Sequence, residues 1–155
     1  MSKFLSTKTY GNHTGLSCVF RQWRAKHSHC QLLHGYALGV KLTFECEELD
    51  ERNWVMDFGG LKELKQWLHH MFDHTTIIAI DDPELPAFRE LYNKGLCELR
   101  TVPGVGCEMF AKLIYERMNA IFSKLATSHQ LLNTTVRIKS VEVFEHGANS
   151  AIYEG

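Results

Sequence analysis

The chain has 155 residues, of which 45% are hydrophobic and 23% charged, and its formal net charge is −1. This composition is typical of one globular domain, and the charge excludes the basic surface that nucleic acids or anionic membranes attract. No apolar run approaches the roughly 18 residues of a membrane-spanning helix, and the first residues lack the apolar core of a signal peptide. Five widely spaced cysteines without a CxxC pair indicate a reduced protein. We therefore expect a single cytoplasmic domain over residues 1–155, with no nucleic-acid and no membrane partner.

The first half of the chain predicts two strands and a helix. Residues 16–23 have the mixed polarity of a strand, and residues 38–46 alternate apolar and polar side chains with the period of a half-buried strand. Asp57 is suited to cap the start of a helix, because its carboxylate can accept hydrogen bonds from free backbone N–H groups. The helix that follows has an apolar stripe at helical spacing, made of Leu61, Leu64, Leu68 and Met71.

The second half predicts further short elements and one longer helix. A β-prone run covers residues 75–80, a helix opens at 81–84, and a strand follows at 97–102. The longer helix has an apolar stripe made of Phe110, Ile114, Met118 and Ile121. In residues 136–143 the alternation of a strand slips at Ser140, which is consistent with a β-bulge. This order of elements predicts an α+β fold in which helices cover one face of an antiparallel sheet.

Side chains suited to proton transfer and metal binding are concentrated in residues 27–36. This stretch holds three histidines together with Cys30 and Tyr36, and it comes just before the strand predicted at 38–46. A second reactive pair, Asp73-His74, follows the first predicted helix. A thiol and a carboxylate-supported imidazole can form an activated nucleophile or a proton relay. A chance scatter of these residue types over a soluble domain is the alternative, and composition alone leaves both interpretations open.

Four segments occur in the order Cys30-x-x-x-His34-Gly35, Trp54-Val55-Met56-Asp57-Phe58, Phe72-Asp73-His74, and Glu145 ahead of Asn149 and Tyr153. In this order the chain resembles the 6-pyruvoyltetrahydropterin synthases and, among them, the bacterial 6-carboxytetrahydropterin synthases of the queuosine route. The resemblance covers roughly residues 14–154. It implies a tunnelling fold (T-fold), in which antiparallel sheets of several subunits close into a barrel. It further implies a homohexamer of two stacked trimers, with active sites between subunits.

The resemblance also assigns roles to individual residues. Cys30 matches the family's catalytic thiol, and Asp73 and His74 match a pair in which the histidine transfers protons and the aspartate orients it. Glu145 matches the carboxylate that anchors the 2-amino group and a ring N–H of the pterin, and a carboxylate accepts two parallel N–H bonds well. A solvated acid at a strand end is the alternative for Glu145. Two more residues match positions near the pterin, with helix capping as their alternative role: Cys107 and Glu108.

The metal site of the family is only partly present. The family binds catalytic zinc through three histidines, one in a Phe-Ser-Ala-Ala-His-Arg strand and two in His-Gly-His. This chain has Phe20 at the first position and His34-Gly35-Tyr36 at the others, so one of the three histidines is retained. Phenylalanine has no donor atom and tyrosine rarely ligates zinc, whereas a catalytic zinc needs three protein ligands and an open position. Either a zinc site has been rebuilt around His34 and His29, with help from His27 or Tyr36, or it has been lost.

The resemblance implies a lyase that acts on 7,8-dihydroneopterin triphosphate. In the family, zinc polarises the hydroxyls of the substrate's side chain while a base abstracts a side-chain proton. Triphosphate is lost and a 6-substituted tetrahydropterin forms, with 6-carboxytetrahydropterin as the leading product. Two alternatives remain: another T-fold pterin enzyme, such as an aldolase acting on the dihydroneopterin side chain, and a non-catalytic pterin-binding protein. The incomplete set of zinc histidines favours the last of these.

Overall fold

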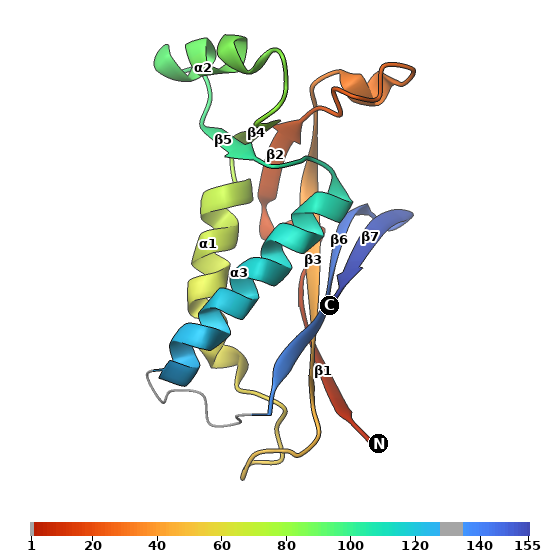
Figure 1. Ribbon diagram of the computed structural model, residues 1–155, viewed down its shortest axis with the longest axis vertical. Coiled ribbons are helices and arrows are strands. Elements are labelled where there is room, and N and C mark those ends of the chain that lie inside the picture. The colour runs from red at the N-terminus through yellow and green to blue at the C-terminus, as the bar shows by residue number, and fades with distance from the viewer. Residues whose placement is uncertain (1, 128–134) are drawn as a thin grey trace.

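The computed structural model describes residues 2–127 and 135–155, and it places two long helices on one face of a twisted sheet (Figure 1). The helices are α1 (Lys62–Phe72), α2 (Leu85–Asn93) and α3 (Cys107–Thr127). The strands are β1 (Phe4–Tyr10), β2 (Leu16–Phe20), β3 (His34–Cys46), β4 (Thr75–Ala79), β5 (Leu99–Val102), β6 (Arg137–His146) and β7 (Asn149–Glu154). Three short 3-10 turns complete the described elements: η1 (Asn12–Thr14), η2 (His29–Gln31) and η3 (Phe58–Leu61). None of the helices in these residues is long and apolar enough to cross a membrane.

Strand β3 organises the sheet, whose order is β5-β4-β2-β3-β6-β7. Its 13 residues pair with β2 along the first part and with β1 along the second, so β1 and β2 lie end to end beside it. Strand β6 pairs with the other edge of β3, and β7 pairs with β6. The outer edges of β1 and β7 therefore carry no strand partner among the described residues.

The core lies between the sheet and helices α1 and α3. Alternate residues of β3 face it, and four of them are at most 1% exposed: Leu38, Val40, Leu42 and Phe44. The apolar stripes predicted for the two long helices are buried against them, with Leu64 and Phe110 fully inaccessible. Aromatic rings connect the layers, since Phe44 meets Phe122 of α3 at a centroid distance of 5.8 Å. Each such side chain contributes roughly 1.5–3 kcal/mol when it is removed from water.

Most predicted elements are present with shifted ends. The strand predicted at 16–23 ends at Phe20, because the chain after Phe20 turns away from β3, and the N–H of Gln22 donates to Cys30 instead, at 2.7 Å. Asp57 does cap the turn before α1, where its carboxylate accepts the N–H of Gly59 at 2.9 Å. The β-bulge is confirmed: Thr43 pairs with Ser140 and the next residue of β3 with Ile138, which leaves Lys139 as the extra residue.

The predicted antiparallel sheet with helices on one face is confirmed, and it carries a parallel extension that the sequence did not predict. Strand β4 pairs in parallel with β2, and β5 pairs in parallel with β4. All five residues of β4 are buried, as expected for a strand covered on both faces. Strands β1 and β7 were also absent from the prediction. Their less exposed positions hold polar or small residues such as Ser6, Lys8 and Ala151, so neither sequence alternates clearly between apolar and polar side chains.

A buried ion pair connects the end of β2 with the turn after β4, where the parallel part of the sheet begins. The guanidinium of Arg21, just after β2, donates to both carboxylate oxygens of Asp82 at 2.8 and 2.9 Å. The Asp82 side chain is 1% exposed and that of Arg21 is 20% exposed. The hydrogen bond from Arg21 lowers the pKa of Asp82 despite its burial. The third nitrogen of the Arg21 guanidinium donates to the carbonyl of Gln31 at 3.3 Å, so the pair also holds the loop before β3.

We predict that Arg21→Ala destabilises the fold by about 3 kcal/mol, because it leaves a buried carboxylate without its partner. The matched control is Arg24→Ala, which breaks an exposed pair with Asp81 and should cost less than about 1 kcal/mol. Urea unfolding at one fixed protein concentration measures both changes.

The effect of Arg21 should also depend on pH. A carboxyl whose pKa is lowered in the folded state stabilises the fold above its unfolded pKa, here 3.8, and this stabilisation is lost as the pH falls through the folded value. The difference between the parent and Arg21→Ala should therefore shrink as the pH is lowered below 3.8. Equal effects of Arg21→Ala and Arg24→Ala at neutral pH would contradict the role given to the pair.

Candidate active site

The three positions that match the family's zinc ligands come together at one end of the β2–β3 pair. Phe20 pairs directly with His34, and Tyr36 follows two residues later on the same face of β3. The ring centroids are 5.3 Å apart for Phe20 and His34, 6.0 Å for Phe20 and Tyr36, and 5.4 Å for His34 and Tyr36. Phe20 is 1% exposed and also packs on Phe110 of α3. The three positions that match the family's zinc histidines thus form a cluster of three aromatic rings.

Tyr36, Glu145 and Cys107 form a second group next to these rings. Burial and then the charge of the nearby Glu145 carboxylate raise the pKa of the Tyr36 phenol. Burial also raises the pKa of Cys107 to about 12, with the charges of Glu145 and Glu108 adding to the effect. Both groups are therefore neutral hydrogen-bond donors at neutral pH. The structure brings together Glu145, Cys107 and Tyr36, and it leaves Glu108 exposed at the start of α3.

Two residues that the sequence analysis did not single out shape this region. The side-chain amide of Asn12 donates to the carbonyls of Ala37 and Glu145, at 2.6 and 3.2 Å, and so fixes the backbone of β3 and β6 at the site. Gln22 lies against the turn before α3, where a Cβ on Gly106 would be 2.3 Å from its amide nitrogen. Gly106 also has a φ of 111°, which other residues rarely adopt. No local sequence pattern marks either residue as part of the site, because each acts through a contact between segments that are distant in the sequence.

Cys30 lies in η2, within the orange loop before β3 in Figure 1, and its side chain is exposed. The hydroxyl of Ser28 accepts the N–H of Cys30 at 3.1 Å, and the Cys30 carbonyl accepts the N–H of Gln22 at 2.7 Å. The thiol is close enough to Tyr36 for its charge to contribute to the raised pKa of that phenol. The loop thus holds an accessible thiol beside the group of Tyr36 and Glu145.

Asp73 and His74 form the expected pair, with a third residue that the sequence analysis missed. The Asp73 carboxylate is 2.5 Å from Nδ1 of His74 and 3.1 Å from Nδ1 of His69, which lies one helical turn earlier in α1. The hydrogen bonds with His74 and then His69 lower the pKa of Asp73. The side chain of His74 is 90% exposed, and its backbone has a φ of 58°, the left-handed region. Asp73 therefore holds an imidazole that reaches outward into solvent.

Within one chain Cys30 and His74 lie toward opposite ends of β2. The N–H of His74 donates to the carbonyl of Ser17, whereas Cys30 is bonded to Gln22 beyond the other end of the strand. At about 3.3 Å per residue, the chain from Ser17 to Gln22 spans roughly 16 Å. The thiol and the imidazole of one chain consequently do not form a contact pair.

The donor set at the family's zinc position does not fit a zinc ion. Phe20 has no donor atom and tyrosine rarely ligates zinc, so the one usual ligand is His34, whose Nδ1 contacts the carbonyl of Leu32 at 2.7 Å and whose Nε2 alone could bind a metal. In residues 2–127 and 135–155, no group of three or more His, Cys, Asp or Glu side chains is arranged to hold a metal. The structure thus gives no support to a rebuilt zinc site around His29 and His34, and His29 is an exposed residue of η2.

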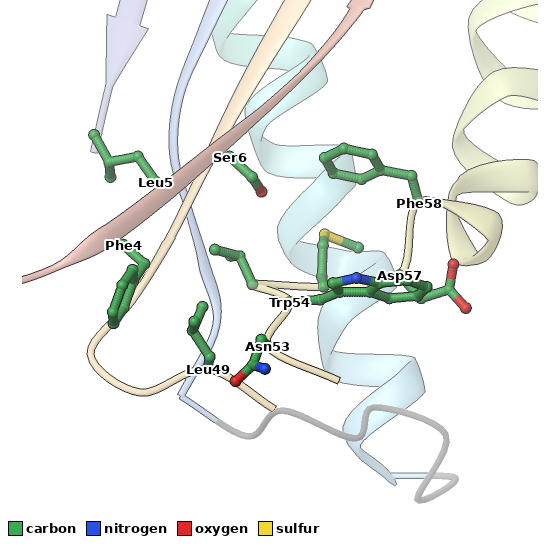
Figure 2. A pocket seen from close by; sticks show the side chains of 10 residues that line it. Phe4, Leu5, Ser6, Leu49, Asn53, Trp54, Asp57 and Phe58 are labelled. Atoms are coloured by element: carbon green, nitrogen blue, oxygen red, sulfur yellow. The ribbon is translucent and has the colours of Figure 1, made fainter. Parts of the chain in front are cut away.

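A further hollow lies at the other end of β3. Figure 2 shows a groove of about 510 Å³ between β1 and the segment before α1, lined by side chains that include Phe4, Leu5, Trp54 and Phe58. Phe4 pairs with Cys46 at the far end of β3 from His34. Because β3 has 13 residues, this end is roughly 40 Å from the candidate site at about 3.3 Å per residue. The groove holds no thiol or imidazole, so it is no part of the candidate site.

The model of one protein family, 6-pyruvoyl tetrahydropterin synthase, matches residues 12–155. The chain belongs to this family. Among curated relatives, a 6-carboxy-5,6,7,8-tetrahydropterin synthase of Rickettsia typhi is 29% identical over 111 residues, which are 70% of this chain and 77% of that one. Another of the same name, from Aquifex aeolicus, is 27% identical over 128 residues, covering 81% and 75% of the two chains.

Solved structures confirm the fold of this family. An uncharacterized protein from Wolinella succinogenes superposes with a TM-score of 0.75 at 20% identity, covering 99% of this chain and 98% of that one. A 6-pyruvoyl tetrahydropterin synthase of Plasmodium falciparum gives a TM-score of 0.68 at 17% identity, covering 100% and 99%. The tunnelling fold predicted from the sequence is therefore confirmed.

We predict that His69→Ala raises the pKa of Asp73 toward its ordinary value, because one of the two hydrogen bonds that lower it is removed. His70→Ala is the matched control, since His70 is the next residue, is exposed, and is no partner of Asp73. Carbon-13 NMR titration of the Asp73 carboxyl measures the shift. An unchanged Asp73 midpoint in His69→Ala would show that His69 does not support the pair.

Proposed function

We propose that this protein is a pterin lyase that converts 7,8-dihydroneopterin triphosphate to a 6-substituted tetrahydropterin, with loss of triphosphate. The observation that carries the proposal is the group formed by Glu145, Tyr36, Cys107 and the nearby Cys30 thiol. The relatives named 6-carboxy-5,6,7,8-tetrahydropterin synthase support 6-carboxytetrahydropterin as the product. Because this product keeps one of the three side-chain carbons, the other two leave as acetaldehyde, and one water is consumed. The five cysteines are all free, which is consistent with the cytoplasmic location we propose.

In this proposal Glu145 binds the pterin ring. A pterin presents its 2-amino group and a ring N–H side by side, and an ionised carboxylate accepts two such parallel bonds. Glu145 is half-buried at the end of β6, where the backbone bond from Asn12 fixes its position. Partial burial strengthens both hydrogen bonds, because the local dielectric is lower than in water. Cys107, a neutral thiol near Glu145, lines the pterin site and can donate a weak hydrogen bond to the ligand.

The proton transfers require two copies of the chain. We propose that Cys30 of one copy acts as the base on the substrate's side chain, and that the Asp73–His74 pair of a neighbouring copy relays the proton. The separation of Cys30 and His74 within one chain supports this arrangement, as does the 90% exposure of the His74 side chain. Asp73 keeps the imidazole oriented and stabilises its protonated form, as carboxylates do in proton relays.

The outer edges of the sheet support an oligomeric barrel. Strands β1 and β7 end the antiparallel part on either side with unpaired edges, and closure against a second copy would satisfy their backbone groups. The exposed side chains of Phe4, Leu5 and Trp54 at the groove beside β1 lie along one of these edges (Figure 2). We propose that a second copy covers them, in a homohexamer of two stacked trimers.

One observation favours a second function, the binding of a pterin without turnover. Phe20 and Tyr36 replace two ligands of the family's catalytic zinc, and a Lewis acid contributes several kcal/mol to such reactions. The exposed Cys30 thiol and the Asp73–His74 pair favour the enzyme instead, because ligand binding alone does not use them. Release of triphosphate from the substrate distinguishes the two functions.

We predict that Cys30→Ala and His74→Ala each reduce triphosphate release by at least about 100-fold, the usual effect of removing an acid–base group. If each site combines residues of two copies, unfolding the two variants together and refolding the mixture should restore activity, because some interfaces then hold both intact residues. Each variant refolded alone is the control. Absence of recovery in a mixture that forms mixed oligomers by mass spectrometry would contradict the shared site.

We predict that Glu145→Gln weakens pterin binding by about 1.5–3 kcal/mol, the range for hydrogen bonds to a charged group. The melting temperature should barely change, because Glu145 is partly exposed to water in the free protein. Isothermal titration calorimetry with neopterin measures the affinity. The neighbouring strand residue Glu142, whose carboxylate accepts from Ser150 at 2.7 Å, provides the control Glu142→Gln. Equal affinity of the parent and Glu145→Gln would return Glu145 to a structural role.

A further inference from the structure

The family's metal position holds three rings that leave little for a metal to bind. Phe20 offers carbon alone, Tyr36 is a poor zinc ligand, and His34 could offer only Nε2, since its Nδ1 contacts the Leu32 carbonyl. The three ring centroids lie within 6.0 Å of one another, so the rings themselves fill the corner of the β2–β3 pair. The chemistry of this donor set disagrees with zinc.

We infer that Tyr36 has taken the place of the metal, and that its hydroxyl donates a hydrogen bond to a side-chain oxygen of the pterin in a site that binds without zinc. This inference rests on the proposed pterin function. It assigns Tyr36 as a substrate-contacting residue, which the family's pattern of three histidines does not include.

The contacts of Tyr36 explain how one phenol can serve this role. In the free protein, burial and then the charge of the nearby Glu145 carboxylate raise the pKa of the Tyr36 phenol, so the hydroxyl keeps its proton. When a pterin donates its own two N–H groups to that carboxylate, the acceptor is occupied, and the hydroxyl of Tyr36 is free to turn to the ligand. The substituent at the ring's 6-position, which carries the oxygens, then lies at the metal position of the family. His34 holds the ring of Tyr36 there by an edge contact, and Phe20 packs against it at a tilt.

Tyr36 and Glu145 together determine which chemical class of ligand the site recognises. A neutral phenol donates one hydrogen bond and does not chelate, so it recognises a hydroxylated side chain without requiring a pair of adjacent oxygens. Glu145 recognises the ring, and Tyr36 recognises the substituent. The two residues should consequently differ in which part of a ligand they sense, and this difference provides the test.

The test measures binding of two probes, neopterin with its trihydroxypropyl side chain and pterin without a side chain, to chelator-treated protein with and without added zinc. We expect the parent to bind neopterin equally well in both conditions. Tyr36→Phe should weaken neopterin binding about tenfold and pterin binding by less than about twofold, whereas Glu145→Gln should weaken both, because one hydrogen bond to a polar group is worth about that factor. Tyr92→Phe, on the exposed face of α2, is the matched control.

Three results would overturn the inference alone. The first is a parent that loses neopterin on chelation and regains it with zinc. The second is a Tyr36→Phe variant that binds both probes like the parent, and the third is one that weakens both equally, which would indicate a role only in supporting Glu145. A parent that binds neither probe would overturn the proposed function itself and this inference with it. Thermal melting of Tyr36→Phe close to that of the parent shows that the variant is folded.

Discussion

The ion pair between Arg21 and Asp82 is the interaction on which the candidate site depends most. Its partners come from the end of β2 and from the turn after β4, and Arg21 also binds the carbonyl of Gln31 in the loop that carries Cys30. A buried bidentate pair fixes direction as well as distance, because the planar guanidinium matches the carboxylate along two parallel bonds. The ion pair thereby fixes the position of the Cys30 thiol, although the side chain of Cys30 is exposed and is not packed in the core.

The corner of the β2–β3 pair is stabilised by contacts that need no metal. The pairing of β2 with β3 brings Phe20, His34 and Tyr36 together there, because strand register depends on the core side chains and the turns. The identity of the three side chains is independent of that register. Phe20 gained a place in the core against Phe110, and Tyr36 gained a partner in Glu145, so both replacements are stabilised by neighbours that do not involve a metal.

Local pattern predicted the elements whose side chains meet the core. The stripes of α1 and α3 and the alternation of β3 follow from burial on one face, and the structure confirms them. Strands β1 and β7 escaped prediction because their less exposed positions hold polar or small residues, so their sequences show no clear alternation. The resemblance to the family placed Cys30, Asp73 and Glu145. The supporting residues Asn12, Gln22 and His69 could not be predicted, since each acts through a contact that only the folded chain creates.

The backbone of His74 has a consequence for how variants of this protein are judged. Its φ of 58° lies in a region where a side chain beyond glycine costs roughly 1–2 kcal/mol. The chain therefore holds its outward imidazole in a conformation that glycine would adopt with less strain. Engineering that rewards heat resistance alone would drift toward glycine at this position and lose the imidazole. At residue 74, selection for thermal stability and selection for the outward imidazole therefore favour different side chains.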